Sequence, residues 1–316
     1  MNKRDVVFSL LQSDQVPPYT PAAFFLHFDP EFHRGQAAID KHLEYFHYTG
    51  MDFVKIQYEN RYPALPEIRR PEDWENMPFY GLDFYEAPLK IVDGLVKAAG
   101  TDAPVIMTLY SPFMCAVHSA GEARVIQHIQ ENPQAVNKGM QVITESLMGF
   151  ASACAKLGLD GFYASTQGGE VGRFPENPGP ELFDQCIRPY DLALMAEIKQ
   201  VCSLNILHIC DYRLPYADLH PYLDYPGQIV NSSLELTSSR LTAREVAHFF
   251  GRPYMGGMDR KGVLATGTEE QVRAEAQEIL KGSPDRFILA ADCTVLPGTP
   301  WSNLRAAVET AHRYQR

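Results

Sequence analysis

The segment NILHICDYR, residues 205–213, is a short apolar run that ends in charged, turn-forming residues. Such a run is typical of a buried β-strand. Seven other runs of the same character bring the total to eight. They are AAFFLHF (22–28), DFVKIQY (52–58), PVIMTLY (104–110), GFYASTQ (161–167), QIVNSSL (228–234), PYMGGMD (253–259) and RFILAADC (286–293). Most of these runs are continuously apolar, which predicts a parallel sheet covered on its outside.

The segments between these runs have helical spacing. Residues 37–50 and 135–158 carry such a pattern and end in a glycine, which favours a helix C-terminus. Thr242 with Glu245 and Thr268 with Gln271 predict capping boxes, and residues 301–315 form the last helical pattern. Eight strands, each followed by a helix, favour a single closed (β/α)8 TIM barrel over residues 1–316. A doubly wound sheet is the alternative.

Three segments lie outside the regular repeat. Residues 1–20 predict an N-terminal helical extension. The stretches 59–85 and 168–189 hold many prolines and predict elaborated loops after the second and fourth strands. Long loops are often functional, and we expect both to lie on the C-terminal face of the barrel.

Composition excludes several classes of partner. The formal net charge is -11 and no Lys- or Arg-rich run occurs, so we expect neither a nucleic acid nor a membrane as partner. The first residues do not resemble a secretion signal, and no long apolar span follows, which predicts a cytoplasmic protein. Six cysteines are scattered along the chain without a CxxC pair. This pattern favours reduced thiols and metal ligands over a disulfide framework.

The strand ends carry the candidate functional residues, because loops at the C-terminal face of a barrel converge on one mouth. His208 and Cys210 are two residues apart in a strand, so both side chains project from the same face. Cys293 ends the last predicted strand at the same level of the barrel. One His and two Cys side chains with an open fourth position suit a catalytic Zn²⁺ ion. Core packing of these three side chains is the alternative.

Further candidates follow other strands. Asp259, a candidate catalytic residue, and Arg260, a candidate substrate-binding residue, follow two glycines that allow a close ligand approach; a tight turn with a salt bridge is the alternative. Glu170 and Gln167 are candidates for a displaceable fourth ligand or for orienting the substrate. Glu235 is a candidate acceptor for the N–H of a metal ligand. Tyr58, at the end of the second predicted strand, is a candidate substrate-binding residue.

Three motifs resemble the uroporphyrinogen decarboxylase superfamily: LHICD (207–211), GGMDRKG (256–262) and FILAADCTVLPGTPWSNLRAAVE (287–309). They are most similar to its zinc-dependent branch, the methylcobamide:thiol methyltransferases. That branch implies a (β/α)8 barrel and zinc bound through His-x-Cys and a later Cys, a pattern on which His208, Cys210 and Cys293 fall. The decarboxylases themselves fit poorly, because their Arg-rich motif near the first strand is replaced by HFDPEFHRGQ (27–36), with Arg34 as its one arginine. Their catalytic Asp after the second strand has no clear counterpart, although Glu59 lies close.

The resemblance implies a zinc-dependent methyltransferase. It would move a methyl group between a corrinoid (methylcobamide) and a small acceptor such as a thiol. A separate partner protein would carry the corrinoid, since no DxHxxG cobalamin motif is present. Two alternatives remain open. One is a decarboxylase-like lyase that acts without metal through a carboxylate, and the other is a zinc-binding barrel without turnover.

Overall fold

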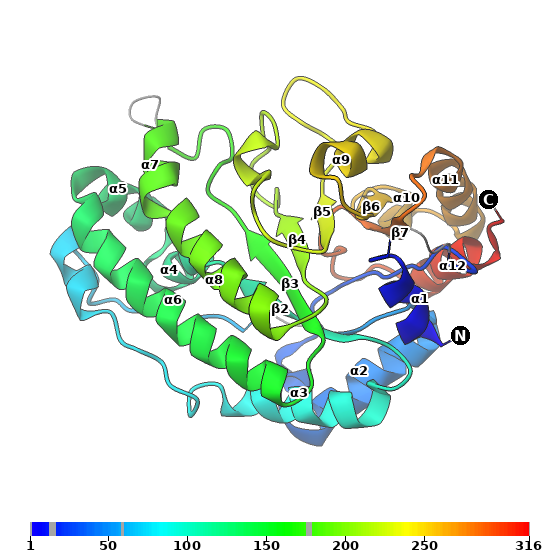
Figure 1. Cartoon of the computed structure of the whole chain (residues 1–316), viewed down its shortest axis with the longest axis horizontal. Helices are drawn as coiled ribbons and strands as arrows, with labels where there is room; N and C mark the ends of the chain where they lie inside the picture. Colours follow the sequence, from blue (N-terminus) through cyan, green and yellow to red (C-terminus); the bar gives the residue numbers. More distant parts are fainter. Residues whose placement is uncertain (1, 13–16, 58–59, 175–178, 316) are drawn as a thin grey trace.

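A computed structural model describes residues 2–12, 17–57, 60–174 and 179–315. Its core is one sheet of seven parallel strands that follow one another in chain order without a reversal (Figure 1). A doubly wound sheet reverses its strand order near the middle, so the structure favours the barrel-like alternative. The strands are β1 (Val54–Ile56), β2 (Val105–Tyr110), β3 (Gly161–Thr166), β4 (Ile206–Ile209), β5 (Ile229–Ser232), β6 (Tyr254–Met258) and β7 (Phe287–Ala291).

The first of the eight predicted strands, residues 22–28, is not a regular strand. Only Ala22 forms a bridge, with Leu289 of β7. The N–H of Ala22 donates to a carboxylate oxygen of Asp52, and the N–H of Leu26 donates to the side chain of Gln57. Because side chains accept these hydrogen bonds in place of strand carbonyls, the ladder is interrupted. The segment still lies between β7 and β1, since Ala23 N–H donates to Leu289 and Phe28 N–H donates to Gln57.

Helices surround the curled sheet, most of them on its outer side, and several contact the strands directly (Figure 1). They are α1 (Lys3–Ser9), α2 (Gly35–Thr49), α3 (Glu86–Ala99), α4 (Pro112–Ala120), α5 (Glu122–Glu131), α6 (Pro133–Lys156), α7 (Gly179–Cys186), α8 (Arg188–Val201), α9 (Ala243–Phe250), α10 (Val263–Thr266), α11 (Glu269–Gly282) and α12 (Trp301–Arg313). Short 3₁₀ turns are η1 (Pro30–Phe32), η2 (Pro71–Asn76) and η3 (His220–Tyr222). No helix of the described residues is both long and apolar enough to cross a membrane.

The predicted helix ends agree with the structure. Gly50 caps α2 in the left-handed conformation, with φ at 73°. Both predicted capping boxes form: Thr242 with Glu245 begins α9, and Thr268 with Gln271 begins α11. Each box satisfies two backbone donors that a helix N-terminus otherwise leaves without partners.

The N-terminal extension is only partly helical. Helix α1 ends at Ser9, and residues 13–16 of the predicted extension lie outside the described residues. Arg4 forms an ion pair with the buried carboxylate of Asp160, which also accepts a hydrogen bond from the N–H of Val105. Since Val105 begins β2 and Asp160 directly precedes β3, α1 lies at the amino ends of the strands. The candidate functional residues lie at the opposite, carboxyl ends of the strands.

A buried carboxyl group predicts an unusual pH dependence of stability. Asp191 of α8 is 1% exposed, and it accepts hydrogen bonds from Thr166 and Tyr225. Burial raises the pKa of Asp191 from 3.8 to about 8. Between these pH values the folded chain holds one proton more than the unfolded chain, so the free energy of unfolding falls as pH rises, by up to about 1.4 kcal/mol per pH unit.

The Asp191→Asn variant is therefore expected to gain stability relative to the wild type as pH increases from about 4 to 8. Urea denaturation across this range would measure the difference. Asp184→Asn, which changes an exposed carboxylate on α7, is the control and should keep the wild-type pH dependence. A constant difference between Asp191→Asn and the wild type across the range would contradict the prediction.

Candidate metal centre

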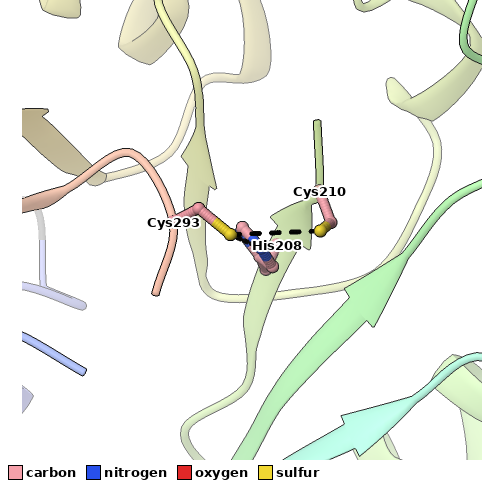
Figure 2. Close-up of side chains that lie close together, drawn as sticks. All are labelled: His208, Cys210 and Cys293. Carbon is pink, nitrogen blue, oxygen red and sulfur yellow. Dashed lines mark hydrogen bonds between the residues drawn. The ribbon is translucent and has the colours of Figure 1, made fainter. Parts of the chain in front are cut away.

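Three side chains at the carboxyl ends of two strands lie close together. His208 lies on β4, Cys210 directly follows that strand, and Cys293 lies two residues after the end of β7. The Sγ atoms of Cys210 and Cys293 are 4.0 Å apart, and Cys293 Sγ is 3.4 Å from His208 Nε2 (Figure 2). All three side chains are buried. We call these residues the His/Cys cluster.

The spacing of the cluster fits a tetrahedral metal ion. Zinc–sulfur bonds of about 2.3 Å place two sulfur ligands about 3.8 Å apart, and a nitrogen and a sulfur ligand about 3.6 Å apart. The observed Sγ–Sγ distance of 4.0 Å is slightly longer than the first value, and the observed Sγ–Nε2 distance of 3.4 Å is slightly shorter than the second. All the potential ligand atoms lie within 4.8 Å of one another, and no fourth His, Cys, Asp or Glu joins them among the described residues. The cluster thus offers a metal ion three ligands and leaves one position open.

The two cysteines are hydrogen-bonded to each other, and each shifts the pKa of the other. A hydrogen bond from the Cys293 thiol, together with the neighbouring His208, lowers the pKa of Cys210 well below its usual value. The same hydrogen bond and burial raise the pKa of Cys293. The Nε2 atom of Gln167 also donates a hydrogen bond to the Cys210 sulfur at 3.3 Å. These contacts favour the thiolate of Cys210, which is the form of cysteine that binds a metal cation.

A cavity of about 190 Å³ opens onto the cluster. Its lining includes apolar and aromatic side chains, two further histidines and two arginines, and none of its described lining residues is Asp or Glu. They are His27, Arg61, Thr108, Tyr110, Met114, Val117, His118, Tyr163, Ser165, Gln167, His208, Cys210, Tyr212, Arg213, Cys293 and Thr294. The His/Cys cluster therefore faces a cavity whose described lining carries no carboxylate.

Arg260 joins the two segments that carry the cysteines. Its Nη1 atom donates to Asp292 at 2.8 Å and to Asp211 at 3.2 Å, and its backbone N–H also donates to Asp292. Asp292 directly precedes Cys293, and Asp211 directly follows Cys210. The two carboxylates raise the pKa of Arg260 although burial opposes this. The salt bridge that sequence reasoning weighed as the alternative for Arg260 is thus present, and it ties the two cysteine segments together.

In the described part of the chain, Glu170, Glu235 and Asp259 do not join the cluster. Glu170 is buried, but its carboxylate pairs with Arg173 and accepts a hydrogen bond from the N–H of Gly168. Glu235 pairs with Arg240 on the surface at 3.1 Å, and within the described parts of the chain its carboxylate accepts no hydrogen bond from His208. Asp259 is exposed and lines a neighbouring cavity of about 420 Å³. Tyr58, and with it Glu59, lies outside the described residues.

Sequence reasoning missed two residues that surround the cluster. Tyr163 stacks on the ring of His208, and Asn231 is paired with His208 in the register between β4 and β5. Strand periodicity offered a signal for Tyr163, because Tyr163, Ser165 and Gln167 alternate along one strand and therefore face the same side.

Comparisons with known proteins give one consistent picture. The family model for uroporphyrinogen decarboxylase (URO-D) matches residues 48–314. Methylcobamide:CoM methyltransferase MtbA of Methanosarcina mazei is 24% identical over 250 residues, which are 78% of this chain and 70% of the relative. Methylcobamide:CoM methyltransferase MtaA of Methanosarcina barkeri is 21% identical over 267 residues, which are 83% of this chain and 74% of the relative.

Solved structures support the fold. A methyltransferase from Methanosarcina mazei superposes with a TM-score of 0.76 at 17% identity, covering 98% of both chains. A B12-independent methionine synthase from Shewanella sp. W3-18-1 gives a TM-score of 0.55 at 13% identity, over 94% of this chain and 97% of the other. At these identities the superpositions establish the shared fold.

Proposed function

Since this chain belongs to the uroporphyrinogen decarboxylase family, we propose that it is the family's zinc-dependent type of methyltransferase. It would move a methyl group between a corrinoid and a small acceptor, most simply a thiol. The observation that carries this proposal is the buried His/Cys cluster at the carboxyl ends of the strands, which has one open ligand position. The relatives named methylcobamide:CoM methyltransferases support the same reaction.

The donor set favours zinc over harder cations. Two sulfurs and one imidazole nitrogen suit Zn²⁺, whereas Mg²⁺ and Ca²⁺ prefer oxygen ligands. When bound here, zinc would keep an acceptor thiol in its nucleophilic thiolate form at neutral pH. We propose His208, Cys210 and Cys293 as the protein ligands, and the burial of all three limits competition from water.

The cavity sets the size of the acceptor. A volume of about 190 Å³ lies below the roughly 300–1,000 Å³ of typical pockets for drug-sized ligands. A small thiol would fit, whereas a corrinoid is too large and would approach over the cavity mouth. Tyr110, Met114 and Val117 supply an apolar side to the cavity. This size limit supports the expectation that a partner protein presents the corrinoid from outside the cavity.

The two alternatives from the sequence are less well supported. A metal-free lyase needs a carboxylate at the reacting centre, and none of the described residues lining the cavity is Asp or Glu. Arg61 and Arg213 line the cavity as that alternative expects, but Arg213 is already paired with Glu122. A closed zinc site without turnover needs a fourth protein ligand, and the described chain supplies three.

Removal of zinc tests the function. Zinc-loaded protein is expected to transfer the methyl group of methylcobalamin to coenzyme M, and a strong chelator should abolish the reaction because the thiol would lose the cation that keeps it deprotonated. Re-addition of zinc should restore the rate. The measurements are the visible spectrum of the corrinoid and the amount of methylated thiol.

Two results would contradict the proposal: full activity in protein shown to be metal-free, or no transfer by protein that holds one zinc per chain. Thiol and methylcobalamin without protein provide the background rate.

A further inference from the structure

Among the described residues, the imidazole of His208 has no partner for the hydrogen bond that usually orients a metal-binding histidine. Such a histidine normally donates its second ring N–H to a carboxylate, a carbonyl or water. His208 is 1% exposed, yet within the described parts of the chain its Nδ1 atom has no hydrogen-bond partner. Glu235, predicted as this acceptor, lies on the surface with Arg240. The ring must therefore be held by other contacts.

A stacked tyrosine supplies the main contact. The rings of Tyr163 and His208 are 4.5 Å apart between centroids and 24° from parallel. Phe25 packs edge-on against Tyr163 at 5.2 Å and restricts the tyrosine ring in turn. The hydroxyl of Tyr163 donates a hydrogen bond to Oδ1 of Asn231. Both the position and the tilt of the tyrosine ring are thereby set.

Asn231 links this tyrosine to the segment that carries Cys293. Its Nδ2 atom donates to the carbonyl of Met255 at 2.9 Å and to the carbonyl of Ala291 at 3.1 Å. Ala291 is the last residue of β7, two residues before Cys293. All the donors of this fully buried amide, and its acceptor oxygen, thus have partners. The side chain of Asn231, on β5, thus forms hydrogen bonds with residues of β3, β6 and the end of β7.

We propose that Tyr163 and Asn231 are positioning residues that set the geometry of the metal centre, in place of a hydrogen bond to His208 Nδ1. Tyr163 orients the imidazole through its ring, and Asn231 fixes that ring and the strand end before Cys293. This inference rests on the proposed zinc site. It assigns the two residues no contact with the reacting atoms.

The test measures zinc release from zinc-loaded protein to an excess of a chromophoric chelator. Tyr163→Phe keeps the ring and removes the hydroxyl, and Asn231→Ala removes all three hydrogen bonds. Each variant is expected to lower zinc affinity about 10–100-fold, as loss of outer-shell partners typically does. Tyr163→Leu removes the stacked ring and should also change the visible absorption of Co²⁺-loaded protein, which reports ligand geometry.

Tyr254→Phe is the matched control. Tyr254 is a buried tyrosine of β6 whose hydroxyl donates to the carbonyl of Ser232 at 2.8 Å, and not to Asn231 or to a residue of the cluster. It should lower the melting temperature about as much as Tyr163→Phe while leaving zinc affinity unchanged. In the double variant, Tyr163→Phe should add little to Asn231→Ala, because both remove the same hydrogen bond.

The outcomes separate this inference from the proposed function. Wild-type affinity in both Tyr163→Phe and Asn231→Ala would overturn it, as would an equal loss of affinity in Tyr254→Phe. A wild-type protein that holds no zinc would overturn the metal centre itself, and the inference with it.

Discussion

Replacing Cys210 by serine is expected to remove zinc from the protein and to abolish methyl transfer. Cys210 supplies one of two sulfur ligands, and its hydrogen bond with Cys293 lowers its pKa well below the usual value, which favours the metal-binding thiolate. A serine hydroxyl stays protonated at neutral pH and is a poor ligand for zinc. Loss of a direct ligand should exceed the about 10–100-fold loss of affinity that follows loss of an outer-shell partner.

Elemental analysis and the methylcobalamin assay measure this effect together. Cys202→Ser is the matched control, because Cys202 is also buried but its sulfur faces the carbonyl of Leu159 and lies outside the cluster. We expect about one zinc per chain and full activity in the control. A Cys210→Ser variant that keeps stoichiometric zinc and wild-type activity would refute the ligand assignment.

Replacing Arg260 by methionine is expected to lower the free energy of unfolding by about 3–5 kcal/mol. The Arg260 side chain is 3% exposed, and those of Asp211 and Asp292 are 16% and 17% exposed. Removing the guanidinium leaves two poorly solvated carboxylates without their cation, which costs more than the loss of a surface pair. Zinc should also bind more weakly, because each carboxylate is next to a cysteine of the cluster.

Urea denaturation followed by circular dichroism measures the loss of stability. Arg273→Met is the control, since Arg273 is 34% exposed and pairs with Glu309 on the surface, where an ion pair contributes about 0–1 kcal/mol. Equal, small effects in the two variants would show that the Arg260 ion pairs do not contribute as argued.

Much of the fold could be predicted from the sequence, because seven of the predicted apolar runs contain the seven strands. The run at 22–28 has the same composition, but whether it forms a ladder depends on Asp52 and Gln57, whose side chains accept two of its backbone N–H groups. Such acceptors depend on tertiary contacts and leave no mark in local periodicity. That residues 1–316 form one domain stays a prediction.

The candidate site could also be predicted only in part, because some of its residues lie on strands and others lie in loops. His208, Cys210 and Cys293 lie on or next to strands, and the periodicity of strands together with their common C-terminal level predicted that they meet. Glu170 and Glu235 lie in loops, where the chain direction is not fixed by a repeat. Their arginine partners, Arg173 and Arg240, could not be identified by spacing alone. Tyr163 and Asn231 come from strands that are not adjacent to each other, so only the structure shows their hydrogen bond.

The most direct test of the metal centre is X-ray absorption at the zinc edge of the purified, zinc-loaded protein. We expect one zinc per chain with two sulfur ligands at about 2.3 Å and one protein nitrogen at about 2.0–2.1 Å. A light atom from solvent would occupy the remaining position. A spectrum without sulfur ligands, or folded protein that binds no zinc, would refute the proposed metal centre.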